Sequence, residues 1–169
     1  MRIRVILAVV LLTSAIQAQQ ANPQTSEKQH CAMMKRGDAG MGFSHEKTTH
    51  HFILLKDGGT IQVGANDPKD DVSRDQIRMH LSHIAKMFSE GDFDTPMFIH
   101  DTTPPGVPTM TKLHSEIHYQ YQPTNSGAKI VIATANPKAL HAVHEFLRFQ
   151  IDEHQTGDPT EIRNDAAQR

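Results

Sequence analysis

Two pairs of histidines stand three residues apart, each in a stretch whose apolar spacing predicts a helix. The first pair is His80 and His83, and the second is His141 and His144. Side chains at positions i and i+3 of a helix are neighbours, with Cβ atoms about 5–6 Å apart, so each pair could grip one ion. If the two helices lie side by side, the four imidazoles form a site suited to zinc or copper.

Helical geometry indicates which other residues could join this site. Met87 lies on the same flank of the first predicted helix as His80 and His83, and its thioether suits Cu(I). His154 projects from the apolar stripe of the last predicted helix, but it follows His144 by ten residues. Ten residues span roughly 15 Å along a helix axis, so His154 and His144 cannot share one ion. We therefore leave His154 out of the predicted site.

Two positions on predicted strands complete the ligand set. His50 and His51 begin one strand and point to opposite faces, so at most one of them can join a shared site, and the spacing leaves open which one. His100 precedes a proline-rich loop, where side chains often enter a site, and Asp101 could orient its ring. The predicted metal ligands are His80, His83, His141, His144, His51, His100 and Met87.

A second group of soft ligands lies near the N-terminus. Thioether, thiol and imidazole groups of this kind suit the capture or transfer of Cu(I), although exported arms also carry such residues without function. Cys31 is the single cysteine and could instead form an intermolecular disulfide. The members of this group are His30, Cys31, Met33, Met34, Met41 and His45.

Several motifs that identify one cofactor or reaction are missing from the chain. It has no C-x-x-C-H sequence for haem c, no C-x-x-C redox pair and no H-E-x-x-H zinc motif. It also lacks the glycine-rich loops that bind nucleotides and the G-x-S-x-G elbow of hydrolases. We therefore expect neither haem c nor a nucleotide as cofactor.

The elements that must position these residues are predicted from periodicity and turn signals. Alternation and turn residues indicate two β-hairpins, and apolar residues at helical spacing indicate two long helices. A short apolar run is interpreted as a buried strand, and residues 109–115 as a helical turn that leads into the next strand. The predicted strands are 49–55, 60–63, 96–100, 117–122 and 129–134, and the predicted helices are 73–91 and 136–155.

This order, β-β-α-β-β-β-α, predicts an α+β domain whose mostly antiparallel sheet carries two main helices on one face. We place that single domain at residues 44–157. Residues 19–43 show no sustained period and are expected to form a flexible arm, and the polar tail 158–169 is expected to be disordered.

The first eighteen residues are typical of a secretory signal. Arg2 and Arg4 precede an apolar run that is too short to span a membrane, and cleavage is expected after Ala18. Export would place the protein in the periplasm or outside the cell. Without these two arginines the chain keeps 15 basic residues against 19 acidic ones, which disfavours nucleic-acid and membrane-surface binding.

Three functions are compatible with this sequence. The first is an exported protein that binds copper or zinc in order to store, buffer or transfer the ion. The second is a small exported metal-dependent hydrolase or oxidase that uses the same imidazoles, with Glu145 and Asp101 as candidate partners. The third is an interaction module with a protein partner, in which the histidines serve the core and bind no ligand.

Overall fold

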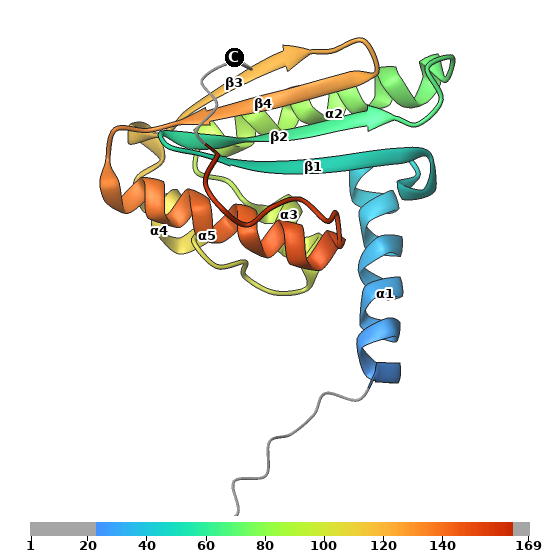
Figure 1. Ribbon diagram of the computed structural model, residues 1–169, viewed down its shortest axis with the longest axis horizontal. Helices are drawn as coiled ribbons and strands as arrows, with labels where there is room; N and C mark the ends of the chain where they lie inside the picture. The colour runs from blue at the N-terminus through green and yellow to red at the C-terminus, as the bar shows by residue number, and fades with distance from the viewer. Residues whose placement is uncertain (1–22, 164–169) are drawn as a thin grey trace, which may run out of the picture.

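The structure, a computed structural model, describes residues 23–163, so the predicted leader 1–18 lies outside them. It confirms an α+β fold built on one four-stranded antiparallel sheet of order β1-β2-β4-β3 (Figure 1). The strands are β1 Thr48–Leu55, β2 Gly58–Ala65, β3 His118–Pro123 and β4 Gly127–Ala133.

Both predicted hairpins are confirmed, and their register places apolar side chains in rows across one face of the sheet. Phe52 pairs with Ile61, which in turn pairs with Ile130, and all three side chains are buried. Because side chains alternate along a strand, His50 lies on the same inward face as Phe52, whereas His51 faces the other way. His50 is therefore the histidine of β1 whose side chain faces the core.

The two long helices cover this inward face, as predicted. Helix α2, Asp71–Ser89, packs on β4, β3 and β2, and α5, Pro137–His154, packs on β1 and β2. Helix α5 begins where expected, because the Asn136 side chain accepts hydrogen bonds from two backbone amides of the first turn. Helix α2 begins earlier than the predicted Ser73, since Asp70 is its N-cap and accepts from the Ser73 amide. None of the described helices is long and apolar enough to cross a membrane.

Short helices replace one predicted strand. Residues 96–100 belong to α3, Asp94–His100, so the prediction of a buried strand there is wrong. The buried residues Pro96, Ile99 and His100 recur at the spacing of a helix face. The predicted helical turn is confirmed as α4, Val107–Lys112, which packs on α5. Two single turns of 3-10 helix, η1 His45–Lys47 and η2 His114–Glu116, lead into β1 and towards β3.

The N-terminal segment forms a helix where the sequence predicted a flexible arm. Helix α1, Pro23–Met41, stands at one end of the sheet and packs on α3 (Figure 1). Its Arg36 Nε donates a hydrogen bond of 2.8 Å to the carbonyl of Ile99. Met33 and Met41 are buried by this packing. The soft ligands of this segment therefore have fixed positions beside the domain.

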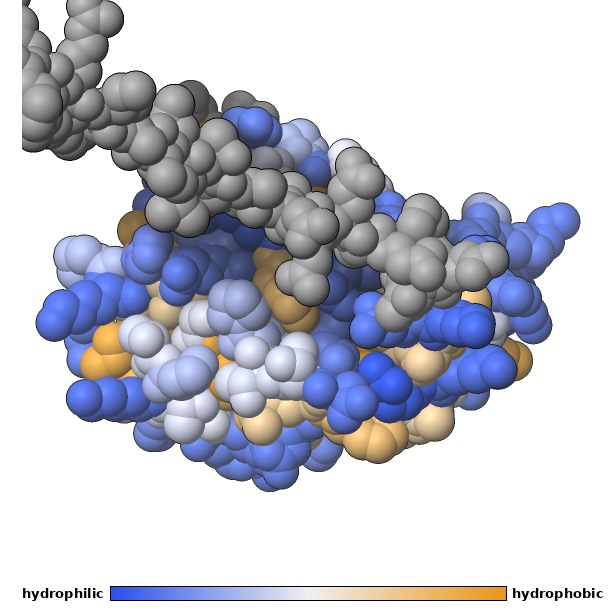
Figure 2. Space-filling model, turned by 90° about the horizontal axis from the view of Figure 1, so that it is seen from below, coloured by the Kyte–Doolittle hydropathy of each residue, from blue (hydrophilic) through white to orange (hydrophobic). Residues whose placement is uncertain are grey.

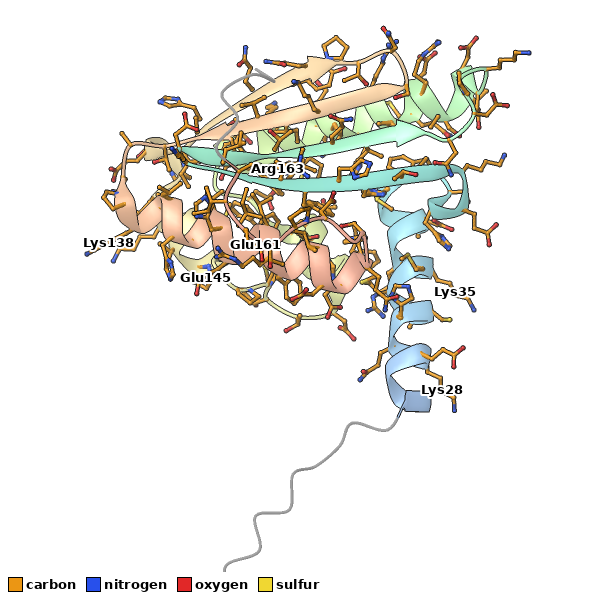
Figure 3. The ribbon with its side chains drawn as sticks, in the orientation of Figure 1. Lys28, Lys35, Lys138, Glu145, Glu161 and Arg163 are labelled. Carbon is orange, nitrogen blue, oxygen red and sulfur yellow. The ribbon has the colours of Figure 1, made fainter. Side chains whose placement is uncertain are left out.

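The described part of the C-terminal tail also has defined contacts, contrary to the predicted disorder. The Asp158 carboxylate accepts hydrogen bonds from the Phe52 amide and from His51 Nδ1, at 2.9 and 3.0 Å. Further along, the Arg163 amide donates to the carbonyl of Leu54, so the tail pairs with the edge of β1 (Figure 3). These bonds hold the outer side of the strand that carries His50.

The surface seen from below is mainly hydrophilic, with small separate apolar patches where it is not covered by grey atoms (Figure 2). The large apolar side chains that remain exposed are Val72, Met79, Phe98 and Ile162. The remaining large apolar side chains of the described chain lie mainly between the sheet and its helices. That layer is also where four of the histidines meet.

Candidate functional site

A buried cavity of about 70 Å³ lies between the inner face of the sheet and helices α2, α3 and α5. Four histidines from four different elements line it: His50 from β1, His80 from α2, His100 from α3 and His154 from α5. The rest of its wall is mostly hydrocarbon. Those other residues are Met41, Phe52, Ile61, Val63, Leu81, Ile84, Phe88, Thr95, Pro96, Ile99, Phe146 and Gln150.

Three of these rings are in contact, and we call His50, His100 and His154 the histidine cluster. The ring centres of His50 and His154 are 5.3 Å apart, with planes 15° from parallel. The ring of His100 meets that of His154 edge-on, with centres 5.2 Å apart. The ring of His80 is joined to that of His50 through Phe43, whose ring centre lies 5.6 Å from His80 and 6.1 Å from His50. His154 is thus the central ring of the cluster.

The rings of the cluster have few hydrogen-bond partners, and His100 is buried whereas His50 and His154 are partly exposed. His100 Nε2 donates to Gln150 Oε1 at 3.0 Å, while His100 Nδ1 has no hydrogen-bond partner in a side chain that is only 1% exposed. Among residues 23–163, no hydrogen bond joins the rings of His50 or His154 to another protein group. Buried polar atoms without partners are rare in folded proteins and often mark a bound ion or water. In a neutral imidazole one nitrogen carries the proton and the other has a lone pair that a ligand can use.

Burial keeps the cavity histidines neutral. It lowers the pKa of His50 from 6.5 to about 4, and the neighbouring imidazoles, His80 first, add to the lowering by charge repulsion. Burial, followed by repulsion from His83, lowers the pKa of His80 to about 4 as well. A neutral imidazole is the form that binds metal, so proton competition at these rings is weak at neutral pH.

The other two rings follow the same pattern. Burial, with repulsion from nearby histidines, holds the pKa of His154 well below 6.5. Burial also lowers the pKa of His100, although its hydrogen bond to Gln150 and the carboxylate of Glu153 oppose that change. Glu153 Oε2 lies 3.8 Å from His100 Nδ1 and is the acidic group nearest to this ring.

A second cavity, of about 240 Å³, lies between α1, the start of β1 and the end of α5, and we call it the α1 cavity. Met41, His50 and His154 line both cavities, so these three residues form the wall between them. The other residues of the α1 cavity are Met33, Met34, Gly37, His45, Thr48, Thr49, Gln155 and Thr156. The ring of His45 is oriented by Asp38, whose Oδ1 accepts from His45 Nδ1 at 2.9 Å.

The cluster is close to, but not in, a metal-binding arrangement. Within the described chain, no three His, Cys, Asp or Glu side chains are placed to hold one ion as they stand. Imidazoles that bind one tetrahedral ion at about 2.0 Å have ring centres about 5 Å apart, which is near both separations within the cluster. The nearly parallel planes of His50 and His154 mean that a ring must turn about its side-chain bonds before both nitrogens face one point.

The four histidines of the predicted HxxH site are not brought together. His80 lines the buried cavity, but His83 is exposed on α2. His141 is 74% exposed on α5, with Glu145 Oε1 at 3.5 Å, and Glu145 points away from the sheet (Figure 3). His144 is buried elsewhere, and its Nε2 donates to the carbonyls of Leu55 and Gly58 at 2.9 and 3.0 Å.

The remaining predicted ligands have mixed placements. His100 belongs to the cluster, whereas Asp101 is exposed and ends α3 with a φ of 54° instead of orienting the ring. His51 faces outward and bonds to Asp158 in the tail. The sulfur of Met87 accepts from the Thr95 hydroxyl at 3.8 Å and is outside both cavity linings.

Sequence reasoning missed His50, His154 and Met41 as members of one site. Two signals pointed to them. His50 lies two residues before Phe52, so both side chains are on the face of β1 that packs on the core. His154 continues the buried stripe of α5 after Leu147 and Ile151. The pairing of β1 with the end of α5 joins residues about a hundred positions apart, and spacing along the chain does not encode it.

We expect His144 to serve stability and not metal binding. His144→Ala should lower the free energy of unfolding by about 1–3 kcal/mol, because two carbonyls lose their shared donor and a buried ring is removed. His141→Ala, on the exposed side of the same helix, is the matched control and should change it by less than about 0.5 kcal/mol. Urea unfolding at pH 7.5 measures both. Equal stability of the two variants would contradict this role.

The candidate site is therefore the histidine cluster together with Met41, at the wall between the buried cavity and the α1 cavity. Any account of function rests on the chemistry of these side chains. The chain matches no family model, no curated protein and no solved structure.

Proposed function

We propose that this protein binds one transition-metal ion, copper or zinc, through the imidazoles of the histidine cluster, and stores, buffers or transfers it. The observation that carries the proposal is the contact of three imidazoles from β1, α3 and α5 that line one cavity, with the buried His100 Nδ1 left without a hydrogen-bond partner. Imidazole nitrogen is a preferred ligand of both ions. The leader-like residues 1–18 support an exported location for this activity.

Two features of the surroundings support a binding role over a catalytic one. The walls of the buried cavity are mostly hydrocarbon, and its space of about 70 Å³ suits an ion better than a substrate. A catalytic metal centre needs an open position for water and substrate. The lowered pKa values of His50, His100 and His154 also remove the proton that would compete with the metal.

Metal stoichiometry tests this proposal. The untagged chain, cleared of metal with a chelator, is titrated with Zn(II) and with copper and then desalted for elemental analysis and native mass spectrometry. We expect one tightly bound ion per chain. His50→Ala/His154→Ala should reduce binding by at least about 100-fold because it removes two of the three rings. The matched control, His118→Ala/His141→Ala, removes two exposed imidazoles and should keep one equivalent.

A further variant separates loss of ligands from loss of folding. His50→Phe/His154→Leu fills the same space with apolar groups beside Phe43 and Phe52, so it should stay folded by circular dichroism and still bind no ion. Retained one-to-one binding in this variant would overturn the proposal. So would a wild-type chain that takes up neither copper nor zinc.

A further inference from the structure

The wall between the two cavities presents a donor set that distinguishes between metal ions. It consists of the imidazoles of His50 and His154 and the thioether of Met41. Thioether sulfur is a soft ligand that selects Cu(I), whereas protein sites for Zn(II) use thiolate, imidazole and carboxylate. Among the residues described, neither cavity has an Asp or Glu in its lining.

The α1 side of the wall carries more groups of the same kind. Met33 and Met41 are buried on one face of α1, and Met34 lines the same cavity. Gly37 lies one helical turn from each of Met33 and Met41, and a Cβ at Gly37 would come within 3.2 Å of the end of the Met41 side chain. The glycine thus leaves room for the Met41 thioether. His45, held by Asp38, adds an imidazole to the lining of this cavity.

The two cavities also differ in size and polarity. The α1 cavity is the larger, at about 240 Å³ against about 70 Å³, and it is lined partly by polar groups such as Thr49 and Thr156. The buried cavity has mostly hydrocarbon walls. An ion that reaches the cluster from the α1 cavity would pass from thioethers on α1 to the imidazoles of His50 and His154.

We propose that the ion is Cu(I), that His50, His154 and Met41 bind it, and that the α1 cavity, lined by Met33, Met34 and His45, is its route to this site. This inference rests on the proposed metal-binding function and narrows it to one ion and one donor set. Cu(I) is stable in two- or three-coordinate sites of soft ligands, so these three side chains suffice to hold it.

Competition titrations of the wild-type chain and its variants test the inference. Cu(I) is titrated without oxygen against a chromophoric Cu(I) chelator, and Zn(II) against a zinc dye. Met33→Leu/Met41→Leu should weaken Cu(I) binding by at least about 10-fold and change Zn(II) binding by less than about twofold. Leucine nearly conserves the volume of methionine, so the fold is expected to persist. Met110→Leu, a buried methionine outside both cavities, is the matched control and should leave both affinities unchanged.

X-ray absorption of the Cu(I)-loaded chain supplies a second readout. A copper–sulfur shell should be present in the wild type and in Met110→Leu, and lost or much reduced in Met33→Leu/Met41→Leu. Unchanged Cu(I) affinity and an unchanged sulfur shell in that double methionine variant would overturn the inference. If His50→Ala/His154→Ala still abolished uptake, the proposed metal binding would stand without it. A wild-type chain that binds no ion would remove both.

Discussion

Acidification from pH 7 to pH 4.5 should cost the metal-free protein several kcal/mol of its free energy of unfolding. The loss should be concentrated between about pH 6.5 and pH 4. In the folded chain the pKa of His50 and that of His80 are lowered to about 4, whereas in the unfolded chain both return to about 6.5. Within this window the unfolded state binds more protons than the folded state, so the free energy of unfolding falls as the pH falls.

The size of the effect follows from the size of the shift. One pKa unit corresponds to about 1.4 kcal/mol, and pH 4.5 lies just above the folded pKa of about 4, so by that pH His50 alone should account for about 2–3 kcal/mol. His80 adds to this, although less than its full share, because part of the lowering at His50 is repulsion from His80. The lowered pKa values of His100 and His154 act in the same direction. Such losses are a large fraction of the 5–15 kcal/mol that stabilises a typical domain.

The charged groups around the cluster do not reverse this sign. Glu153 is the carboxylate that faces His100, and it opposes the lowering at that ring without overcoming burial. Arg36, on the α1 side, lowers the pKa of His100 further. His30, also on α1, acts in the same way on His154. The net expectation is loss of stability in acid.

Urea unfolding curves at pH 7.0, 5.5 and 4.5, in the presence of a chelator, measure this loss. His50→Phe removes one titrating group from an aromatic environment and should reduce the loss by about 2–3 kcal/mol. The matched control is His141→Phe, which removes an exposed imidazole and should follow the wild-type pH dependence. Parallel curves for all three proteins would contradict the assignment of the acid sensitivity to the buried rings.

Local patterns predicted most of the fold. The turn that follows β1, now placed at Lys56-Asp57, the cap at Asn136 and the apolar spacing of the two long helices each act within a few residues, and each formed close to where it was expected. The prediction of a strand at residues 96–100 failed because a run of five mostly apolar residues fits a buried strand or a helical turn equally well. Asp94, in the first turn of α3, was the signal for a helix.

The same limit explains why only part of the candidate site was predicted. Spacing on a helix shows which side chains share a face, and His80 was placed correctly on the buried side of α2. It does not show which element comes opposite that face. The cluster is made where the start of β1 meets the end of α5, so His154 was excluded by its distance from His144, although its partner is His50.

Phe146→Ala should be among the most destabilising single substitutions in the domain, at about 3–5 kcal/mol. Phe146 is 2% exposed, meets Phe88 edge-on with ring centres 5.9 Å apart and meets Phe93 at 6.1 Å. It also lines the buried cavity, so its loss would enlarge a space that already exists. Phe98→Ala is the matched control, because Phe98 is 56% exposed and its truncation should cost less than about 1 kcal/mol.

The same substitution links the core to the site. If hydrocarbon packing keeps the cavity histidines neutral, the space left by Phe146→Ala should admit water and raise the pKa of His50 towards 6.5. The stability lost between pH 7 and pH 5.5 should then be smaller than in the wild type, although the variant is less stable at both values. Urea curves at both pH values measure the two effects together. A destabilised variant with the full wild-type acid loss would show that Phe146 supports the fold without controlling the hydration of the cluster.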